Sequence, residues 1–147
     1  MKYSASTSIN APASVVWKIL LDTARWPEWD PSCDHIEGSV AEGSTVKAFT
    51  KLSPGRAFPV KVTELVPDRR MTWTGGMPLG LFKGVRTFTL EPQPEGGTEF
   101  SLREEFSGPM LALIGRSIPD MTVPFRQFVA GLKARSESAH ANPSGGK

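Results

Sequence analysis

The sequence is poor in the residues that make disulfides and metal sites. Cys33 is the only cysteine, which excludes a disulfide within the chain and fits a reducing compartment. His35 follows at strand-like spacing, but the other histidine, His140, lies near the C-terminus, so further metal ligands are missing. If Ile36 points inward, strand alternation turns Cys33 and His35 outward. Phosphate-loop, dinucleotide and nucleophile-elbow motifs are absent too, and we expect neither a metal nor a cofactor.

Long apolar runs and one-sided charge are also missing. No segment approaches the roughly 18 apolar residues of a membrane-spanning helix. The N-terminal residues are polar and lack the roughly 7 to 15-residue apolar stretch of a signal peptide. The 17 basic and 15 acidic residues are scattered rather than gathered into a stripe, which argues against a nucleic-acid partner. We expect a cytoplasmic protein with no nucleic-acid partner and no stable membrane insertion.

What is present predicts one α+β domain over residues 1–138. A strand-like segment at 3–9 precedes a helical pattern at 13–21 and a second short helix that nearby prolines keep short. Short runs separated by turn clusters then predict an antiparallel meander. Its strands are expected at 32–38, 44–52, 57–66, 69–75, 82–91 and 97–107.

The segment from Pro109 to about Ser138 predicts a long amphipathic helix. Its apolar residues recur at spacings of three or four: Leu111, Ile114, Ile118, Met121, Phe125, Phe128 and Leu132. Pro119 and Pro124 should kink or interrupt it, because each removes an intrahelical donor and crowds the preceding turn. Residues 139–147 have little to bury and are expected to be disordered.

This order of elements resembles the START-like polyketide cyclase/dehydrase (SRPBCC, helix-grip) superfamily. The motifs that carry the resemblance are Ile9-x-Ala11-Pro12-x-x-x-Val16-Trp17, Trp26-Pro27-x-Trp29, Met71-x-Trp73-x-Gly75, Arg86-x-Phe88-x-Leu90-x-Pro92 and Gly97-Thr98-x-Phe100. It covers essentially residues 1–138. The resemblance implies a curved seven-stranded antiparallel sheet around the last helix, two short helices after strand one, and a cavity between helix and sheet. It says little about activity, because the superfamily mixes lipid carriers, receptors, cyclases and cochaperone domains.

The hairpin around 91–97 predicts which side chains face that cavity. Matching Leu90 with Thr98 sets a register in which one face carries most of the aromatic residues, and that face is taken as the inner one. The other pairs on it are Phe88 with Phe100, Arg86 with Leu102 and Gly84 with Glu104. Arg86 and Glu104 then lie diagonal to one another among apolar side chains.

Three roles for Arg86 and Glu104 stay open. They could be a structural ion pair that closes one end of the cavity. They could be the polar anchor of an apolar pocket and orient a ligand carboxylate, phenol or carbonyl. Glu104 could also move a proton in an aldol-type cyclisation or a dehydration, although a guanidinium beside it stabilises the charged carboxylate and argues against that role.

The predicted binding site extends beyond this pair. Trp73 lines the cavity or packs in the core, and Trp29 closes the open end of the sheet or touches ligand. The apolar, glycine-rich loop 75–81 and the start of the last helix either form the cavity entrance or fold back onto the core. The full set is Trp29, Trp73, Met77, Leu81, Arg86, Phe88, Phe100, Leu102, Glu104, Leu111, Ile114, Ile118 and Phe125.

Three functions follow from these alternatives. The first is a carrier or binding protein for a hydrophobic or aromatic small molecule, lipid-like or polyketide-like. The second is an enzyme of the polyketide cyclase or dehydratase type that uses Glu104 and Arg86. The third is a protein-interaction module whose cavity has collapsed. The sequence leaves open the ligand, any reaction and whether the domain forms a homodimer.

Overall fold

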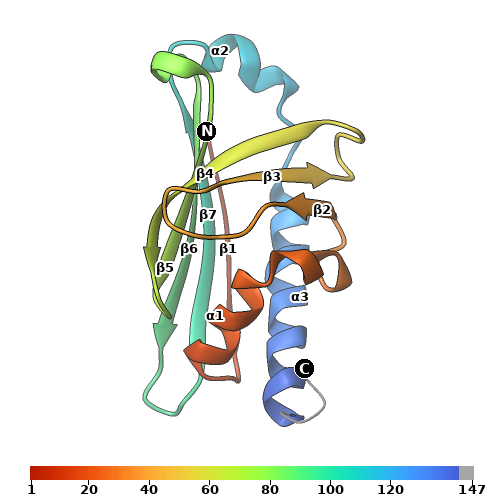
Figure 1. Ribbon diagram of the computed structural model, residues 1–147, viewed down its shortest axis with the longest axis vertical. Coiled ribbons are helices and arrows are strands. Elements are labelled where there is room, and N and C mark those ends of the chain that lie inside the picture. Colours follow the sequence, from red (N-terminus) through yellow and green to blue (C-terminus); the bar gives the residue numbers. More distant parts are fainter. Residues whose placement is uncertain (143–147) are drawn as a thin grey trace.

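A computed structural model of the protein describes residues 1–142. Seven strands form one antiparallel sheet in the order β1-β7-β6-β5-β4-β3-β2. The helices lie on its concave side (Figure 1). The elements in chain order are β1 (Lys2–Ile9), α1 (Ala13–Leu21), η1 (Thr23–Glu28), β2 (Cys33–Glu37), β3 (Thr45–Thr50), β4 (Ala57–Val66), β5 (Arg70–Gly76), η2 (Pro78–Gly80), β6 (Lys83–Pro92), β7 (Thr98–Ser107), α2 (Leu111–Ile114), η3 (Gly115–Ser117) and α3 (Thr122–Ala141).

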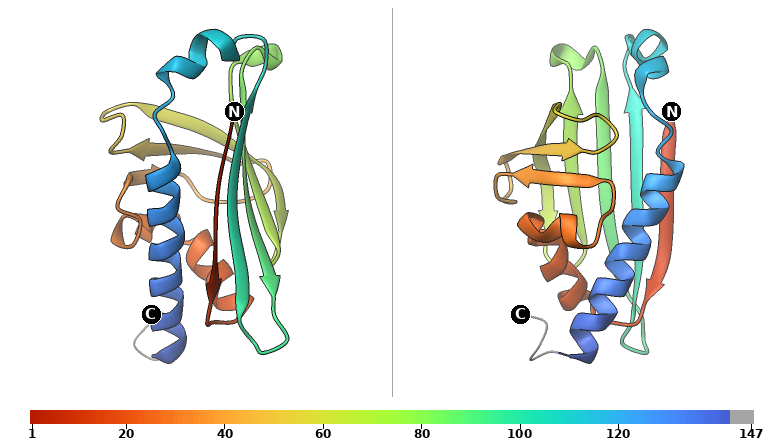
Figure 2. Two further views of the ribbon diagram at one scale, coloured as in Figure 1. Left: turned by 180° about the vertical axis from the view of Figure 1, so that it is seen from behind. Right: turned by 90° about the vertical axis from the view of Figure 1, so that its right-hand side faces the viewer.

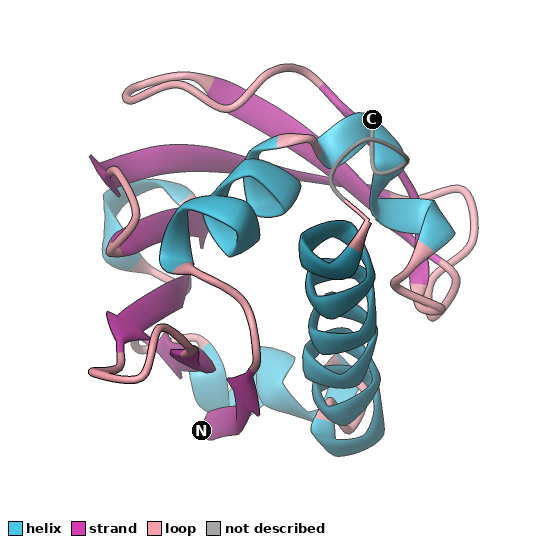
Figure 3. Cartoon of the chain, turned by 90° about the horizontal axis from the view of Figure 1, so that it is seen from below, coloured by secondary structure: helices cyan, strands magenta, loops and turns pink. Residues whose placement is uncertain are grey.

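The sheet curves around α3, as the view from below shows (Figure 3). The two views of Figure 2 place α1 and η1 beside α3 against one end of the sheet, while β5, β6 and β7 continue past the start of α3. This arrangement confirms the expected α+β helix-grip fold with two short helices after strand one. None of the helices among residues 1–142 is long and apolar enough to cross a membrane.

The register of the β6–β7 hairpin differs from the expected one by two residues. Leu90 pairs with Phe100 rather than with Thr98, because β6 continues to Pro92, which itself pairs with Thr98. The turn is closed by the amide of Gln93, which donates to the carbonyl of Gly97 at 2.8 Å. A shift of two residues keeps every side chain on its expected face. It brings Arg86 directly opposite Glu104 instead of diagonal to it.

Cys33 does not point outward as expected. A β-bulge between Cys33 and His35 breaks the alternation of side chains along β2. Cys33 is therefore buried, while Ile36 packs against the core as expected. His35 stacks on Phe49 with ring centroids 4.1 Å apart.

The C-terminal segment is not one continuous helix: α2 and η3 end before Pro119, and α3 begins after it. The residue before Pro119, Ile118, is extended with ψ of 121°, because a proline crowds a helical conformation in the residue before it. Pro124 neither kinks nor interrupts α3, since it lies in the first turn, where its missing N–H would have no partner in any case. α3 continues to Ala141, beyond the expected end at Ser138. Residues 143–147 of the expected disordered tail lie outside the described residues.

Gly131 lets α3 pack closely on the end of η1. A Cβ atom at Gly131 would overlap the backbone carbonyl of Trp29. Glycine costs roughly 1 kcal/mol relative to alanine inside a helix, so this contact overrides local helix propensity. It fixes the distance between α3 and Trp29, the residue that follows η1.

We therefore expect Gly131→Ala to destabilise the protein. Overpacking against a backbone carbonyl should lower the free energy of unfolding by roughly 1 to 3 kcal/mol, measured by urea denaturation. Ala134→Gly, at an exposed position of the same helix, measures the difference in helix propensity between alanine and glycine without any change in packing. A Gly131→Ala variant that is more stable than the parent protein would contradict the close contact.

Candidate functional site

One row of side chains crosses the inner face of the sheet at the level of Arg86. The register pairs Trp73 with Arg86, Arg86 with Glu104, and Glu104 with Tyr3. Val62 of β4 continues the row, because it pairs with Trp73. Four side chains with polar atoms are thus aligned across neighbouring strands. We call Tyr3, Glu104, Arg86 and Trp73 the polar row.

Below the polar row, the inner face is filled by the core. Phe88, Phe100 and Leu102 are completely buried. Trp26 of η1 stacks on Trp73 with ring centroids 5.2 Å apart, and Phe128 of α3 packs against both Trp26 and Trp29. The structure thus places Trp29, Trp73, Phe88, Phe100 and Leu102, five of the predicted ligand-binding residues, in a packed aromatic and aliphatic cluster.

Above the polar row, the apolar side chains are only partly covered. Phe82 stacks on Phe106 at 5.8 Å, Phe106 meets Tyr3 edge-on at 6.4 Å, and Tyr3 meets Phe125 at 6.2 Å. Phe82, Phe106 and Val60 all remain half-exposed. We call this part of the inner face, with Val60, Phe82, Gly84 and Phe106, the open half.

The segment between β7 and α3 carries three more predicted residues to this end of the molecule. Leu111 and Ile114 belong to α2, Ile118 follows η3, and all three are half-exposed. Met77 and Leu81 are more exposed and lie in or beside the β5–β6 turn. The structure brings neither of them to the ion pair.

Arg86 and Glu104 form a direct ion pair at the border between the core and the open half. Arg86 Nη2 donates to Glu104 Oε1 at 2.8 Å, and Arg86 Nε donates to the same oxygen at 3.2 Å. The guanidinium also lies over the ring of Phe125, 5.1 Å from its centroid. The side chain of Arg86 is 24% exposed and that of Glu104 is 14% exposed. Glu104 Oε2 takes no hydrogen bond from residues 1–142 and lies beside Gly84.

Asp30 is a buried carboxylate that our sequence reasoning missed. Its Oδ1 accepts hydrogen bonds from the amide and hydroxyl of Ser32 at 3.2 and 3.1 Å. Burial raises the pKa of Asp30, while the Ser32 hydrogen bonds and the nearby charges of Arg86 and Lys51 lower it in part. Its place directly after the Trp26-Pro27-x-Trp29 motif was the available signal.

Trp73 adds an unpartnered donor to the polar row. Its side chain is 3% exposed, and Nε1 has no hydrogen-bond partner among the described residues. A buried N–H without an acceptor is uncommon and costs stability. The sequence could not reveal this, because it depends on how Trp26 covers the indole ring.

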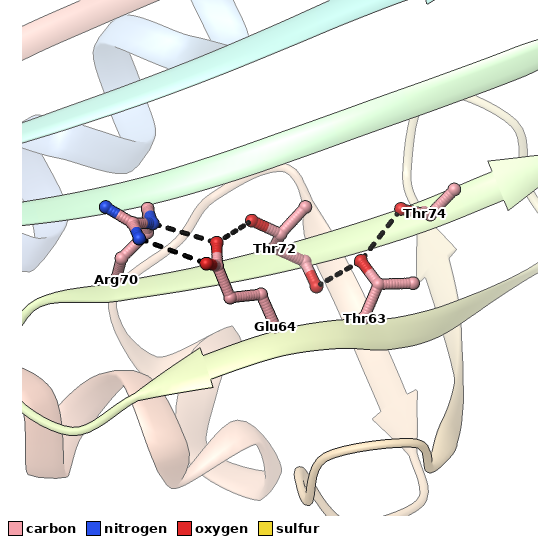
Figure 4. A network of polar contacts seen from close by, with 5 residues as sticks. All are labelled: Thr63, Glu64, Arg70, Thr72 and Thr74. Carbon is pink, nitrogen blue, oxygen red and sulfur yellow. Dashed lines mark hydrogen bonds and ion pairs between the residues drawn. The ribbon is translucent and has the colours of Figure 1, made fainter.

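The outer face of the sheet carries a second ion pair for comparison. Arg70 Nε and Nη2 donate to the two carboxylate oxygens of Glu64 at 2.8 and 3.0 Å (Figure 4). The Thr72 hydroxyl donates to Glu64 Oε1 at 3.1 Å. The Thr63 hydroxyl donates to the Thr72 carbonyl and shares a hydrogen bond with the Thr74 hydroxyl. This pair uses both carboxylate oxygens and is more exposed than Arg86–Glu104.

Two hollows of about 550 and 580 Å³ lie away from the ion pair. The first lies between β4 and the β5–β6 turn; Val60 and Phe82 of the open half contribute to its lining, together with Lys61 and Met77. The second follows the outward-facing side chains of β6 and β7, such as Thr87 and Ser101. Residues 1–142 hold no cluster of His, Cys, Asp or Glu side chains that could bind a metal ion.

The family model for "polyketide cyclase / dehydrase and lipid transport" matches residues 1–137. The chain belongs to this family. Its architecture, a curved sheet around a C-terminal helix, is accordingly the START-like ligand-binding fold of this polyketide cyclase/dehydrase family. No curated protein matches the chain.

Solved structures agree with this fold. A protein of Helicobacter pylori superposes with a TM-score of 0.74 at 18% identity, covering 92% of this chain and 88% of that one. The Zhui aromatase/cyclase of a Streptomyces species gives 0.70 at 14% identity, with 100% and 99% covered. A START superfamily protein of Mycobacterium smegmatis gives 0.66 at 16% identity, with 93% and 97% covered. At these identities the likeness shows the fold alone.

The raised pKa of Asp30 predicts how stability depends on pH. The folded state holds the proton of this carboxyl more tightly than the unfolded state, so its stabilising contribution is complete below the unfolded pKa. That contribution is lost as the pH rises through the folded pKa. We expect Asp30→Asn, which keeps an acceptor for Ser32, to be more stable than the parent at neutral pH. The difference should vanish below about pH 4.

The measurement is urea denaturation of both proteins at a series of pH values. Glu42→Gln, at an exposed position whose carboxylate forms no ion pair within residues 1–142, serves as the control for a general charge effect. A stability difference between the parent and Asp30→Asn that does not change with pH would contradict the burial argument.

Proposed function

We propose that the protein binds an apolar or aromatic small molecule, lipid-like or polyketide-like, on the open half of the inner face. The observation that carries the proposal is the Arg86–Glu104 pair, which lies between the packed core and side chains that remain partly exposed. Its position supports an anchoring role, because it offers polar groups at the edge of an apolar surface. Ligand pockets typically combine an apolar lining with a few such groups.

The apolar side chains of the open half support the same proposal. Val60, Phe82 and Phe106 face the concave side yet stay half-exposed. A ligand that covers them gains about 25 cal/mol for each Å² of apolar surface removed from water. The stacked and edge-on aromatic rings favour a flat or aromatic ligand.

The ion pair keeps unused hydrogen-bonding capacity. Among the described residues, only the Nε and Nη2 groups of Arg86 donate hydrogen bonds, and both donate to Glu104. A guanidinium carries five N–H donors, so the remaining ones can hold a ligand carbonyl, phenolate or carboxylate. The free Oε2 of Glu104 can accept a hydroxyl. A ligand with oxygen at one end of an apolar body fits this arrangement.

A second candidate function is proton transfer in a cyclisation or dehydration. It is supported by the unengaged Oε2 of Glu104 and by Asp30, a second carboxyl close enough for the charge of Arg86 to influence it. Glu104 would accept the proton, and Arg86 would stabilise negative charge that develops on a carbonyl oxygen. The third function, an interaction module, is supported only by the filled core below the polar row.

The first experiment is native mass spectrometry of the protein purified from its own host. A bound species that disappears after denaturation and solvent extraction supports the binding proposal and supplies a ligand. Absence of any bound species, together with no thermal shift across a panel of lipids and polyketides, would contradict it and favour an interaction module.

With a ligand in hand, we expect Arg86→Gln to weaken binding by about tenfold or more, because a hydrogen bond to a charged group contributes about 1.5 to 3 kcal/mol. Glu104→Gln should weaken binding less than Arg86→Gln. Arg86→Gln leaves the Glu104 carboxylate without a partner, which could itself weaken binding. The double variant R86Q/E104Q removes that carboxylate and controls for this effect. The outer-face variants E64Q and R70Q, which remove one partner of a similar pair, should bind as the parent does.

The same variants separate the two candidate functions. If the protein is a carrier, Glu104→Gln changes affinity modestly, and the ligand is recovered unaltered. If it is an enzyme, Glu104→Gln abolishes turnover while the substrate still binds. Equal binding by the parent, R86Q and R86Q/E104Q would show that the ion pair anchors nothing and would overturn the proposed site.

A further inference from the structure

Four large apolar side chains are exposed together at one end of the molecule. Leu79 of η2 is 97% exposed and Leu113 of α2 is 72% exposed, while Met77 and Leu81 are 40% and 39% exposed. Figures 1 and 2 show α2 and the β5–β6 turn side by side at this end. We call Met77, Leu79, Leu81 and Leu113 the apolar tip.

The two parts of the apolar tip are held together by the backbone. The amide of Met110, which precedes α2, donates to the carbonyl of Leu81 at 2.9 Å. Gly108 has φ of 110°, and a Cβ atom there would lie 2.6 Å from the Leu81 carbonyl oxygen, so only glycine allows this approach. The turn and α2 therefore present one surface.

The backbone of the turn holds Leu79 outward at a conformational cost. Leu79 has φ of 61°, a left-handed conformation that is unfavourable for a residue with a branched side chain. Pro78 and Gly80 flank it in the turn. Glycine or asparagine would adopt this left-handed conformation at a lower cost than leucine if the position were needed only to turn the chain. The outlier at Leu79 therefore points to a contact outside the protein.

The two segments that carry the apolar tip have charged side chains of one sign only. Residues 76–83 and 107–119 contain no aspartate or glutamate, and their two charged side chains are Lys83 and Arg116. Neither of these takes part in an ion pair within residues 1–142. Elsewhere the chain mixes both signs. Basic residues behind a projecting apolar surface are complementary to an anionic lipid surface.

We propose that the apolar tip docks the protein reversibly on an anionic membrane surface. Leu79 and Leu113 enter the headgroup region, and Lys83 and Arg116 remain at the level of the lipid charges. A stable protein interface needs about 800 Å² from each partner, whereas this surface consists of a few side chains projecting from two short elements. The proposal does not depend on what the open half of the inner face binds.

The test is flotation with two kinds of vesicle, one of phosphatidylcholine alone and one of phosphatidylcholine and phosphatidylglycerol in equal parts. We expect the protein to float with the mixed vesicles and much less with the neutral ones. The variant L79S/L113S should lose about tenfold in partitioning for each leucine. The variant K83Q/R116Q should lose about fivefold for each charge, on the mixed vesicles only.

The matched control is V66S/V123S, which removes two exposed apolar side chains away from the apolar tip. It should float as the parent does, and thermal unfolding should show all variants folded. No flotation of the parent, or equal flotation of L79S/L113S, would overturn the proposal. So would a dimer of the parent that L79S/L113S abolishes without any vesicle binding, because the apolar tip would then be an interface between two copies.

Discussion

The cross-strand pair of Arg86 and Glu104 divides the inner face of the sheet into a packed half and a partly exposed half. Each charge stabilises the other, because either one alone would be a half-buried ion without a partner. Phe125 covers the guanidinium from α3, and below it the aromatic cluster closes the core. Above the pair, Val60, Phe82 and Phe106 remain half-exposed. The inner face of this sheet thus combines a filled half with a half whose side chains remain partly exposed.

The open half and the apolar tip lie at the same end of the molecule. The strands that carry Arg86 and Glu104 continue toward the β5–β6 turn, and α2 joins the top of β7 to α3 (Figure 2). If the apolar tip docks on a membrane as proposed, the open half lies at the membrane-facing end of the molecule.

Much of the fold could be predicted from the sequence, because turn residues and alternation act locally. The strand ends followed from clusters such as Pro67-Asp68, and the faces of β6 and β7 were right because an error of two residues preserves alternation. The register itself depended on Pro92 pairing with Thr98, which no local rule predicts. The bulge after Cys33 and the close packing of Gly131 on Trp29 are tertiary effects. For the same reason the sequence could not separate filled from open parts of the inner face.

If ligands bind above the polar row and not elsewhere on the sheet, the site can be located by NMR. Backbone amide signals are followed in a titration with anilinonaphthalene sulfonate, an aromatic probe with an anionic end. We expect the shifts to concentrate at Gly84, Phe106 and Ile118 and at the side-chain Nε–H of Arg86, while Thr72 and Thr87 on the outer face stay unchanged. Shifts confined to the outer face, or to the β5–β6 turn alone, would contradict it.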